Sequence, residues 1–148
     1  AECDPTMSFE GLGSLIRMCE VDFAPVKIDI DVGSLRPAAG SNWSEQRCAV
    51  GTIHYGDRDE DKGYLVYLKA AMTGHESTPI LQYKARHPDF PHQTTGDQFY
   101  AEDQFESYRH LGRETATCCF EPVSGARDLV ELATRLRERH ASASVKTG

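Results

Sequence analysis

The chain has 148 residues, of which 39% are hydrophobic and 26% charged, and its mean hydropathy is −0.51. This is enough apolar material to fill one globular domain, which excludes an intrinsically disordered chain. The formal net charge of −7 and the pI of about 5.3 disfavour a nucleic-acid partner, because phosphate binding needs a basic surface. No apolar run approaches the roughly 18–20 residues that a transmembrane helix requires.

The first residues carry no signal-peptide pattern and no initiator Met, so we expect a processed chain or a piece of a longer protein. Five cysteines without a C-x-x-C pair do not resemble a disulfide framework or a zinc knuckle. Cys19 and Cys48 fall in apolar stretches, where we expect them to be buried. This cysteine usage favours reduced thiols and a cytoplasmic location for the segment.

The N-terminal third predicts a helix followed by a strand. Over residues 8–20, apolar side chains recur at helical spacing on one face, namely Phe9, Leu12, Ile16 and Cys19. Over residues 26–32 the period changes to two, and Val or Ile alternates with charged residues. Three charges on one face of this strand indicate that only its other face is buried.

Residues 33–45 are rich in Gly, Ser, Pro and Asn and predict a loop. Strands are expected near 47–55 and 64–70, joined as an antiparallel hairpin by the acidic linker G-D-R-D-E-D-K-G. This linker lacks the Gly and the closing Glu of an EF-hand loop, so we interpret it as a solvated tip rather than a calcium site.

Three further helical segments are expected. The first is a patch around residues 80–85, and the second runs over 101–111, with acids at its start, basic residues at its end and Gly112 as its stop. The third is an amphipathic helix over 127–140. The tail from 141 to 148 is expected to be disordered.

The stretch H-P-D-F-P-H-Q-T-T-G-D-Q-F-Y-A-E-D-Q-F-E-S-Y-R, residues 87–109, is the densest in His, acidic and aromatic side chains. His87 and His92, with Asp89, Asp97 and His75 nearby, could supply zinc or iron ligands. Their spacing fits neither a helical zincin pair nor a facial triad, so structural or surface histidines are the favoured interpretation. A Pro-pinned loop leading into a capped, aromatic-faced helix explains the same residues.

Catalytic motifs are not visible in the sequence: it contains no G-x-S-x-G, no phosphate-binding G-x-x-x-x-G-K-[ST] and no G-x-G-x-x-G. The single Trp43 could mark an interface, but packing over a sheet edge is the favoured alternative. Cys118 and Cys119 could form a redox site, although a short buried segment is the favoured explanation.

The run from Gly63 to Gly112 resembles the C-terminal region of bacterial patatin-like phospholipase proteins. The resemblance rests on G-Y-L-V-Y-L-K, on T-G-H-E and on H-P-D-F-P-H followed by D-Q-F-Y-A-E-D-Q-F-E-S-Y-R-H-L-G. The upstream D-P-T-M-S-F-E-G-L-G-S-L-I-R and R-C-A-V-G-T-I-H-Y-G-D segments are similar to the same family. Two departures are Gln93, where an acid is common, and Tyr100, where Phe is usual.

The resemblance implies the C-terminal part of a patatin-like α/β/α layered fold, with a short, mostly antiparallel sheet and flanking helices. Residues 1–112 would form the C-terminal portion of that domain, 113–140 an extension with its amphipathic helix, and 141–148 the tail. Patatin-like enzymes hydrolyse lipid acyl esters with a Ser–Asp dyad, whose motifs are not in this sequence. No catalytic residue and no cofactor is carried over, and a chain that lacks part of its sheet is expected to be only marginally stable alone.

Two functions are therefore expected as alternatives, with a metal-binding domain as a third. The chain completes a lipid acyl hydrolase, with the upstream catalytic part as its partner and a lipid as the substrate of the parent, which can itself be attached to a membrane. Alternatively it is a non-catalytic interaction module. The polar and aromatic residues that would form an interface are His87, His92, Asp97, Phe99, Tyr100, Phe105, Tyr108 and Arg109.

Overall fold

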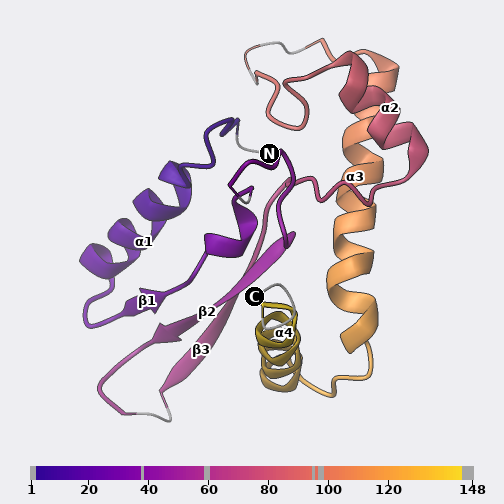
Figure 1. Ribbon diagram of the computed structural model, residues 1–148. Helices are drawn as coiled ribbons and strands as arrows, with labels where there is room; N and C mark the ends of the chain where they lie inside the picture. Colours follow the sequence, from indigo (N-terminus) through magenta and orange to yellow (C-terminus); the bar gives the residue numbers. More distant parts are fainter. Residues whose placement is uncertain (1–2, 38, 59–60, 95, 97–98, 145–148) are drawn as a thin grey trace.

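The computed structural model describes residues 3–37, 39–58, 61–94, 96 and 99–144, and they form a mixed α/β structure (Figure 1). A small antiparallel sheet of three strands lies beside a long helix, and shorter helices flank both. The elements in chain order are α1 (Glu10–Asp22), β1 (Lys27–Asp29), the 3-10 helix η1 (Gly33–Leu35), β2 (Cys48–His54), β3 (Lys62–Leu68), α2 (Thr78–Arg86), α3 (Glu102–Phe120), the 3-10 helix η2 (Glu121–Val123) and α4 (Leu129–Ser144).

The sheet has the order β1-β2-β3, and both neighbouring pairs are antiparallel. The expected hairpin is confirmed: β2 and β3 pair from Cys48 opposite Leu68 to His54 opposite Lys62. The strand expected over 26–32 is paired only over Lys27–Asp29, although the alternation of half-buried and exposed side chains continues to Val32. The predicted loop at 33–45 contains η1.

Helix α1 lies on one face of the sheet and α4 on the other (Figure 1). Paired residues of an antiparallel sheet point to the same face, so Ala49 lies beside Tyr67 on the α1 side, where both pack with the core that contains Leu12. On the opposite face Arg137 of α4 donates a hydrogen bond to the hydroxyl of Thr52. Arg137 also lies over the ring of Tyr64, 5.2 Å from its centroid.

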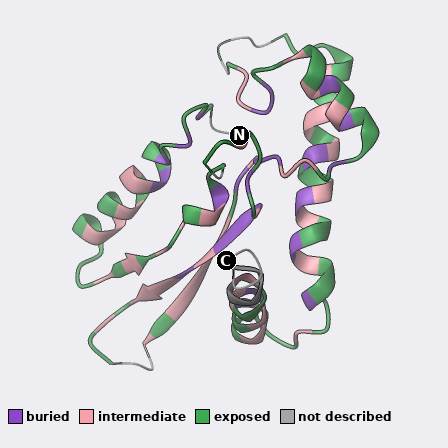
Figure 2. Ribbon diagram, viewed as in Figure 1, coloured by how far each residue is buried: buried purple, intermediate pink, exposed green. Residues whose placement is uncertain are grey.

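The first half of β2 is covered on both faces. Cys48 and Ala49 point to opposite sides of the sheet, and both are buried (Figure 2). A doubly covered strand is not evident from the sequence, because a Cys followed by small residues shows no clear hydrophobic period. Cys48 is buried as expected, whereas Cys19 on α1 is only half-buried.

The N-terminal segment is held by a buried ion pair. Asp4 Oδ2 accepts hydrogen bonds from Lys69 Nζ at 2.9 Å and from the Phe9 backbone N–H at 3.0 Å, and Oδ1 accepts one from the Ser8 N–H at 2.8 Å. Phe9 has a φ of 56°, in the left-handed region that a non-glycine residue rarely adopts. These bonds to Asp4 fix that conformation, and α1 begins at Glu10, two residues later than the expected Ser8.

Helices α2 and α3 enclose a second core, which contains Met72, Ile80, Tyr83, Phe90 and Leu111. The expected stop at Gly112 is wrong, because α3 continues to Phe120. Its apolar face also continues, since Leu111, Thr115 and Cys119 are buried at spacings of four residues. Their burial offsets the cost of about 1 kcal/mol for an interior Gly.

At the C-terminus, α4 extends to Ser144, beyond the expected end at residue 140, and residues 145–148 lie outside the described residues. The vicinal cysteines are not one buried segment: Cys119 is buried in the last turn of α3, whereas Cys118 is exposed. Of the proposed interface residues, Asp97 also lies outside the described residues.

Candidate functional site: the motif segment between α2 and α3

The loop that follows α2 is anchored by a buried phenylalanine. Phe90 is fully buried, with an exposed fraction of 0%. Its ring meets Tyr83 of α2 edge-on at 5.1 Å between centroids and Tyr108 of α3 at 4.8 Å. Edge-to-face aromatic pairs add about 0.5–1.5 kcal/mol each beyond the area they bury, so Phe90 joins the two helices.

The ammonium group of Lys84 holds the backbone of this loop. Its Nζ donates to the carbonyl oxygen of Pro88 at 2.7 Å and to that of Phe90 at 2.5 Å. Burial lowers the pKa of Lys84, and the nearby carboxylate of Asp89 opposes this shift. The lysine is thus used structurally, as a cation that neutralises two carbonyl dipoles at the end of α2.

A small polar network surrounds Phe90. The Tyr108 hydroxyl accepts a hydrogen bond from the Gln93 backbone N–H at 3.3 Å, while Gln93 Oε1 accepts from the Tyr83 hydroxyl at 3.5 Å and from Gln104 Nε2 at 3.3 Å. Burial raises the pKa of both Tyr83 and Tyr108. Both phenols therefore stay protonated and serve as hydrogen-bonding groups.

The two histidines of the motif lie in the first half of the loop between α2 and α3. His87 stacks on Tyr83, with 4.2 Å between ring centroids and 25° between the planes. The His92 carbonyl oxygen accepts a hydrogen bond from Cys3 Sγ at 2.8 Å, which ties the N-terminal segment to the loop. Within the described residues, no three His, Cys, Asp or Glu side chains are arranged to hold a metal ion.

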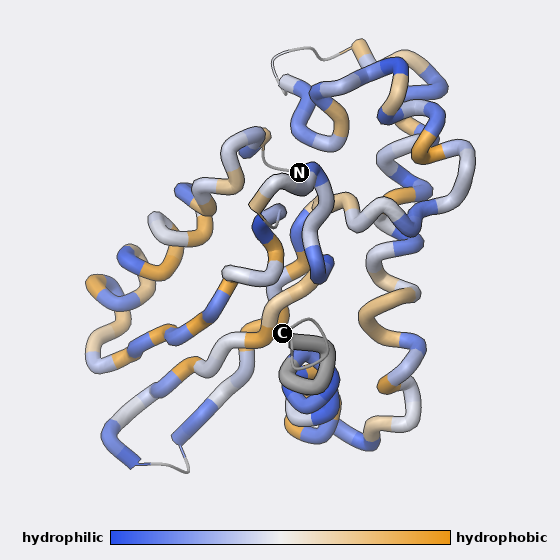
Figure 3. Tube along the Cα trace, viewed as in Figure 1, coloured by the Kyte–Doolittle hydropathy of each residue, from blue (hydrophilic) through white to orange (hydrophobic). Residues whose placement is uncertain are grey.

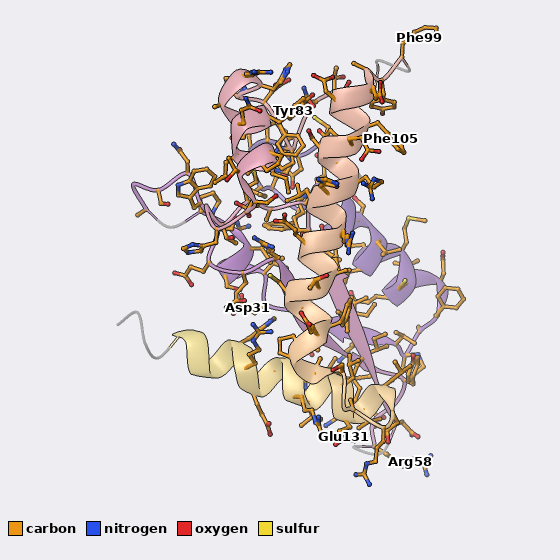
Figure 4. The ribbon with its side chains drawn as sticks, turned by 90° about the vertical axis from the view of Figure 1, so that its right-hand side faces the viewer. Asp31, Arg58, Tyr83, Phe99, Phe105 and Glu131 are labelled. Atoms are coloured by element: carbon orange, nitrogen blue, oxygen red, sulfur yellow. The ribbon has the colours of Figure 1, made fainter. Side chains whose placement is uncertain are left out.

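The remaining residues of the proposed interface lie on the outside. Phe99 is 92% exposed, Phe105 59% and Tyr100 51%, all at the N-terminal end of α3. Figure 4 shows Phe99 and Phe105 pointing away from the helix pair, while Tyr83 points between α2 and α3. Arg109 forms an exposed ion pair with Glu106 at 2.7 Å. The structure therefore divides the segment into two groups. The buried aromatic plug consists of Phe90 with Tyr83 and Tyr108, and the exposed aromatic end consists of Phe99, Tyr100 and Phe105.

Arg47 and Glu76 form a second buried ion pair, which the sequence did not indicate. Arg47 Nη2 lies 2.8 Å from Glu76 Oε1, and Glu76 also accepts the backbone N–H groups of Thr73 at 2.7 Å and Gly74 at 2.9 Å. Gly74 has a φ of +80°, and a Cβ there would lie 3.2 Å from the ring of Trp43. Trp43 therefore lies against this turn, with 37% of it exposed, and its expected packing over a sheet edge stays a prediction. The T-G-H-E sequence is the only local sign of this turn, because its Arg partner is 29 residues away in the chain.

Beside this ion pair lies a groove of about 730 Å³. Its lining is contributed by the start of β2, by the turn before α2 and by α3, and consists of Arg47, His75, Ser77, Pro79, His110, Arg113, Glu114, Thr117 and Cys118. Ser77 donates its backbone N–H to Glu114 at 3.2 Å. The groove joins the sheet to the helical pair and reaches the end of α3.

Comparison of the chain with protein-family models, with curated proteins and with solved structures gave no match. In the part of the chain that the structure describes, every helix is too short or too polar to cross a membrane.

Proposed function

We propose that this chain is a non-catalytic, fold-completing part of a patatin-like lipid acyl hydrolase, whose nucleophile and base are supplied by a segment outside these 148 residues. The observation that carries the fold-completing role is the two-sided apolar character of α1. The hydrolase class is supported by the resemblance of Gly63–Gly112 to the patatin-like pattern.

Helix α1 covers the sheet with one face and exposes large apolar side chains, set among polar ones, on the other. At 100° per residue, Leu12 and Ile16 lie roughly opposite Met18 and Val21. The inner pair packs against the sheet core, whereas Met18 is 61% and Val21 77% exposed. Leu15 on the flank of α1 and Phe23, directly after the helix, are also exposed, by 52% and 65%. Figure 3 shows hydrophobic and hydrophilic positions following one another along α1. A helix that is apolar on both sides is typical of a position between two layers of a larger structure.

The hydrolase itself is tested on the full protein. We expect hydrolysis of phospholipid and short-chain esters that disappears when the Ser of an upstream G-x-S-x-G is replaced by Ala. Unchanged hydrolysis in that variant would refute the class of enzyme, irrespective of the role of α1.

The role of α1 is tested with Met18→Ser combined with Val21→Ser in the same protein. These changes remove apolar contacts with the catalytic layer, so we expect reduced ester hydrolysis and faster proteolysis at the junction. Arg17→Ser is the matched control, because Arg17 is an exposed, charged residue next to Val21 on the same side of the helix, and its change removes no apolar side chain. Equal behaviour of the double variant and the control would exclude this face as a docking surface.

A second candidate function is an interaction module, which the exposed aromatic end of α3 favours. Phe99, Tyr100 and Phe105 are the kind of large side chains that dominate binding energy at interfaces. Phe105→Ala is expected to weaken association with the catalytic part or another partner. If association is unchanged in Phe105→Ala, this role is excluded and the fold-completing role stands alone.

A further inference from the structure

The groove beside the Arg47–Glu76 ion pair is walled by three segments that are distant in the chain. Arg47 comes from the start of β2, His75 and Ser77 come from the turn before α2, and the remaining wall is formed mainly by α3. The volume of about 730 Å³ lies in the range of small-molecule sites. The groove shares no residue with the aromatic plug or with the exposed apolar side chains of α1, so its role is independent of the proposed function.

Helix α3 presents polar side chains to the groove along one side. Arg113, Glu114 and Thr117 lie three, four and seven positions after His110, which places all four on the same side of the helix. The sequence analysis explained the basic residues near position 110 by the C-terminal end of the helix dipole. Because α3 continues to Phe120, Arg113 lies in the middle of the helix, where the dipole has little effect. The charge of Arg113 therefore needs another explanation.

Arg113 supplies the groove with a guanidinium group. Of the two arginines in α3, Arg109 pairs with Glu106 at 2.7 Å, whereas Arg113 forms no ion pair or hydrogen bond with any residue that the structure describes. Its side chain is exposed and lines the groove. A guanidinium carries five N–H donors in a planar fork, which matches the oxygens of an oxyanion.

Arg47 supplies further donors in a fixed position. Its side chain is 7% exposed, and Nη2 donates to Glu76 Oε1 at 2.8 Å and to the Thr73 hydroxyl at 3.0 Å, while Nη1 donates to Sγ of Cys118 at 3.4 Å. These contacts use three of the five N–H donors of the group. Because Glu76 balances its charge, Arg47 contributes donors at a defined place rather than net charge.

The other polar groups of the groove are mostly donors as well. Among the described residues that line it, Glu114 is the only acid. Its Oε2 accepts the Ser77 backbone N–H at 3.2 Å, at the start of α2, where the positive end of the helix dipole favours a carboxylate. The two histidines each carry at least one ring N–H in either protonation state, and Ser77 and Thr117 add hydroxyl groups. An excess of donors is the arrangement that an anion requires.

We propose that this groove binds the phosphate of a phosphate monoester, with the Arg113 guanidinium as its ion-pair partner. The donors come from β2, from the turn before α2 and from α3. A monoester phosphate has three free oxygens that point in different directions and can accept from all three walls, whereas a carboxylate has two oxygens in one plane. The volume leaves room for the organic group attached to the phosphate. A soluble ester and a lipid headgroup share this chemistry, and the experiment distinguishes them.

Cys118 provides a measurement at the site itself. It is exposed and lines the groove, whereas Cys3, also exposed, lies outside the groove lining. The full protein containing this chain is treated with iodoacetamide, an uncharged reagent, and the alkylation rate of each cysteine is measured by mass spectrometry. We expect glycerol phosphate to slow the alkylation of Cys118 and to leave that of Cys3 unchanged. Sodium chloride at the same ionic strength should protect neither.

Arg113→Gln tests the ion pair with the phosphate. Arg109→Gln is the matched control, because it removes the same charge from the same helix outside the groove lining. The concentration of glycerol phosphate that protects Cys118 should rise about 10–100-fold in Arg113→Gln, as for the loss of a charge-assisted hydrogen bond, and stay the same in the control. Arg47 is left in place, because its loss would leave Glu76 buried without its partner.

Vesicles separate the two sources of the phosphate. Protection of Cys118 by phosphatidylcholine vesicles that contain phosphatidic acid, but not by glycerol phosphate or by phosphatidylcholine alone, identifies a lipid headgroup, and the reverse identifies a soluble ester. Equal protection by acetate would overturn the choice of a phosphate. The site itself would be refuted by a Cys118 that reacts equally fast with and without every phosphate compound. A Cys118 that resists iodoacetamide when no ligand is added would also refute it, because the groove would then be covered in the full protein.

Discussion

The sheet region, formed by β1, β2, β3, α1 and α4, differs from the helical region of α2, the motif loop and α3 in how its apolar surface is covered. The helical region closes on itself: Phe90 fills the space between the helices, and its exposed aromatics lie only at one end of α3. The sheet region buries one side of α1 and leaves Leu15, Met18 and Val21 exposed on the other.

Buried charge is also distributed unequally between the two regions. The sheet region depends on Asp4 and Lys69, which are 65 residues apart in the chain and lie 2.9 Å apart with both side chains 4% exposed. Around Phe90, the ammonium group of Lys84 binds two carbonyl oxygens, and neutral tyrosine and glutamine groups form the side-chain hydrogen bonds. The helical region is thus specified mainly by local packing, and the sheet region by long-range ion pairing next to an incompletely covered surface.

The largest expected effect comes from removing the aromatic plug. Phe90→Ala should lower the free energy of unfolding by about 3–5 kcal/mol, because it leaves a cavity between Tyr83 and Tyr108. Urea unfolding measures the loss, and hydrogen exchange should show that amides of α2 and α3 lose protection before those of β2 and β3. Phe99→Ala is the control: at 92% exposure, it should change stability by less than about 0.5 kcal/mol. Equal losses in both regions would mean that the two cores unfold as one unit.

The next largest effect concerns the sheet region. Asp4→Asn keeps the shape of the side chain but removes the charge that faces Lys69, which should cost about 1.5–3 kcal/mol. Here the loss of amide protection should begin at α1 and β3, the reverse of the Phe90 variant. Asp22→Asn, which changes an exposed acid at the end of α1, should leave the unfolding midpoint nearly unchanged. A loss confined to α2 and α3 would contradict the assignment of Asp4 to the sheet region.

Lowering the pH should reduce the stability that the Asp4–Lys69 ion pair contributes. Burial alone would raise the pKa of Asp4, but the hydrogen bonds from Lys69, Phe9 and Ser8 more than offset this and hold it well below the ordinary value of 3.8. The carboxylate therefore contributes stability that is fully present above the unfolded-state pKa and is lost as the pH falls toward the folded-state value. Glu76 has a lowered pKa as well and adds a loss of the same sign. Unfolding free energies measured from pH 7 down to pH 2 should fall, and less steeply in Asp4→Asn than in the wild type.

The elements that the sequence predicted are those whose signal is local. The β2–β3 hairpin follows from period-two alternation on both sides of an acidic linker, and the helical segments follow from apolar spacing. The extent of α3 did not follow, because Gly112 is a common stop and only the burial of Thr115 and Cys119 carries the helix past it. Helix propensity predicts the conformation that a residue prefers, while its tertiary contacts decide whether the residue adopts it.

The candidate site was predicted in part. The Pro-rich loop and the aromatic face of the following helix were visible, but the sequence placed buried and exposed residues in one group. Tyr108 packs on Phe90, whereas Phe105, three positions earlier and nearer the start of α3, is 59% exposed. The Arg47–Glu76 ion pair joins two segments that are 29 residues apart, and nothing local in the sequence marks such a meeting.

The smallest expected loss of stability comes from removing a hydrogen bond between neutral groups, in contrast to the Asp4–Lys69 ion pair. Tyr108→Phe removes the hydroxyl that accepts the Gln93 N–H but keeps the ring that packs on Phe90, so it should cost about 0.5–1.5 kcal/mol. Because the Tyr108 phenol carries no charge near neutral pH, the loss should be the same at pH 5 and pH 7, unlike the loss in Asp4→Asn as acid is added. Urea unfolding at both pH values makes the measurement, with Tyr100→Phe as the control at a half-exposed ring. A pH-dependent loss in Tyr108→Phe would show that an ionised group takes part in the network around Phe90, and the distinction between the two regions would then fail.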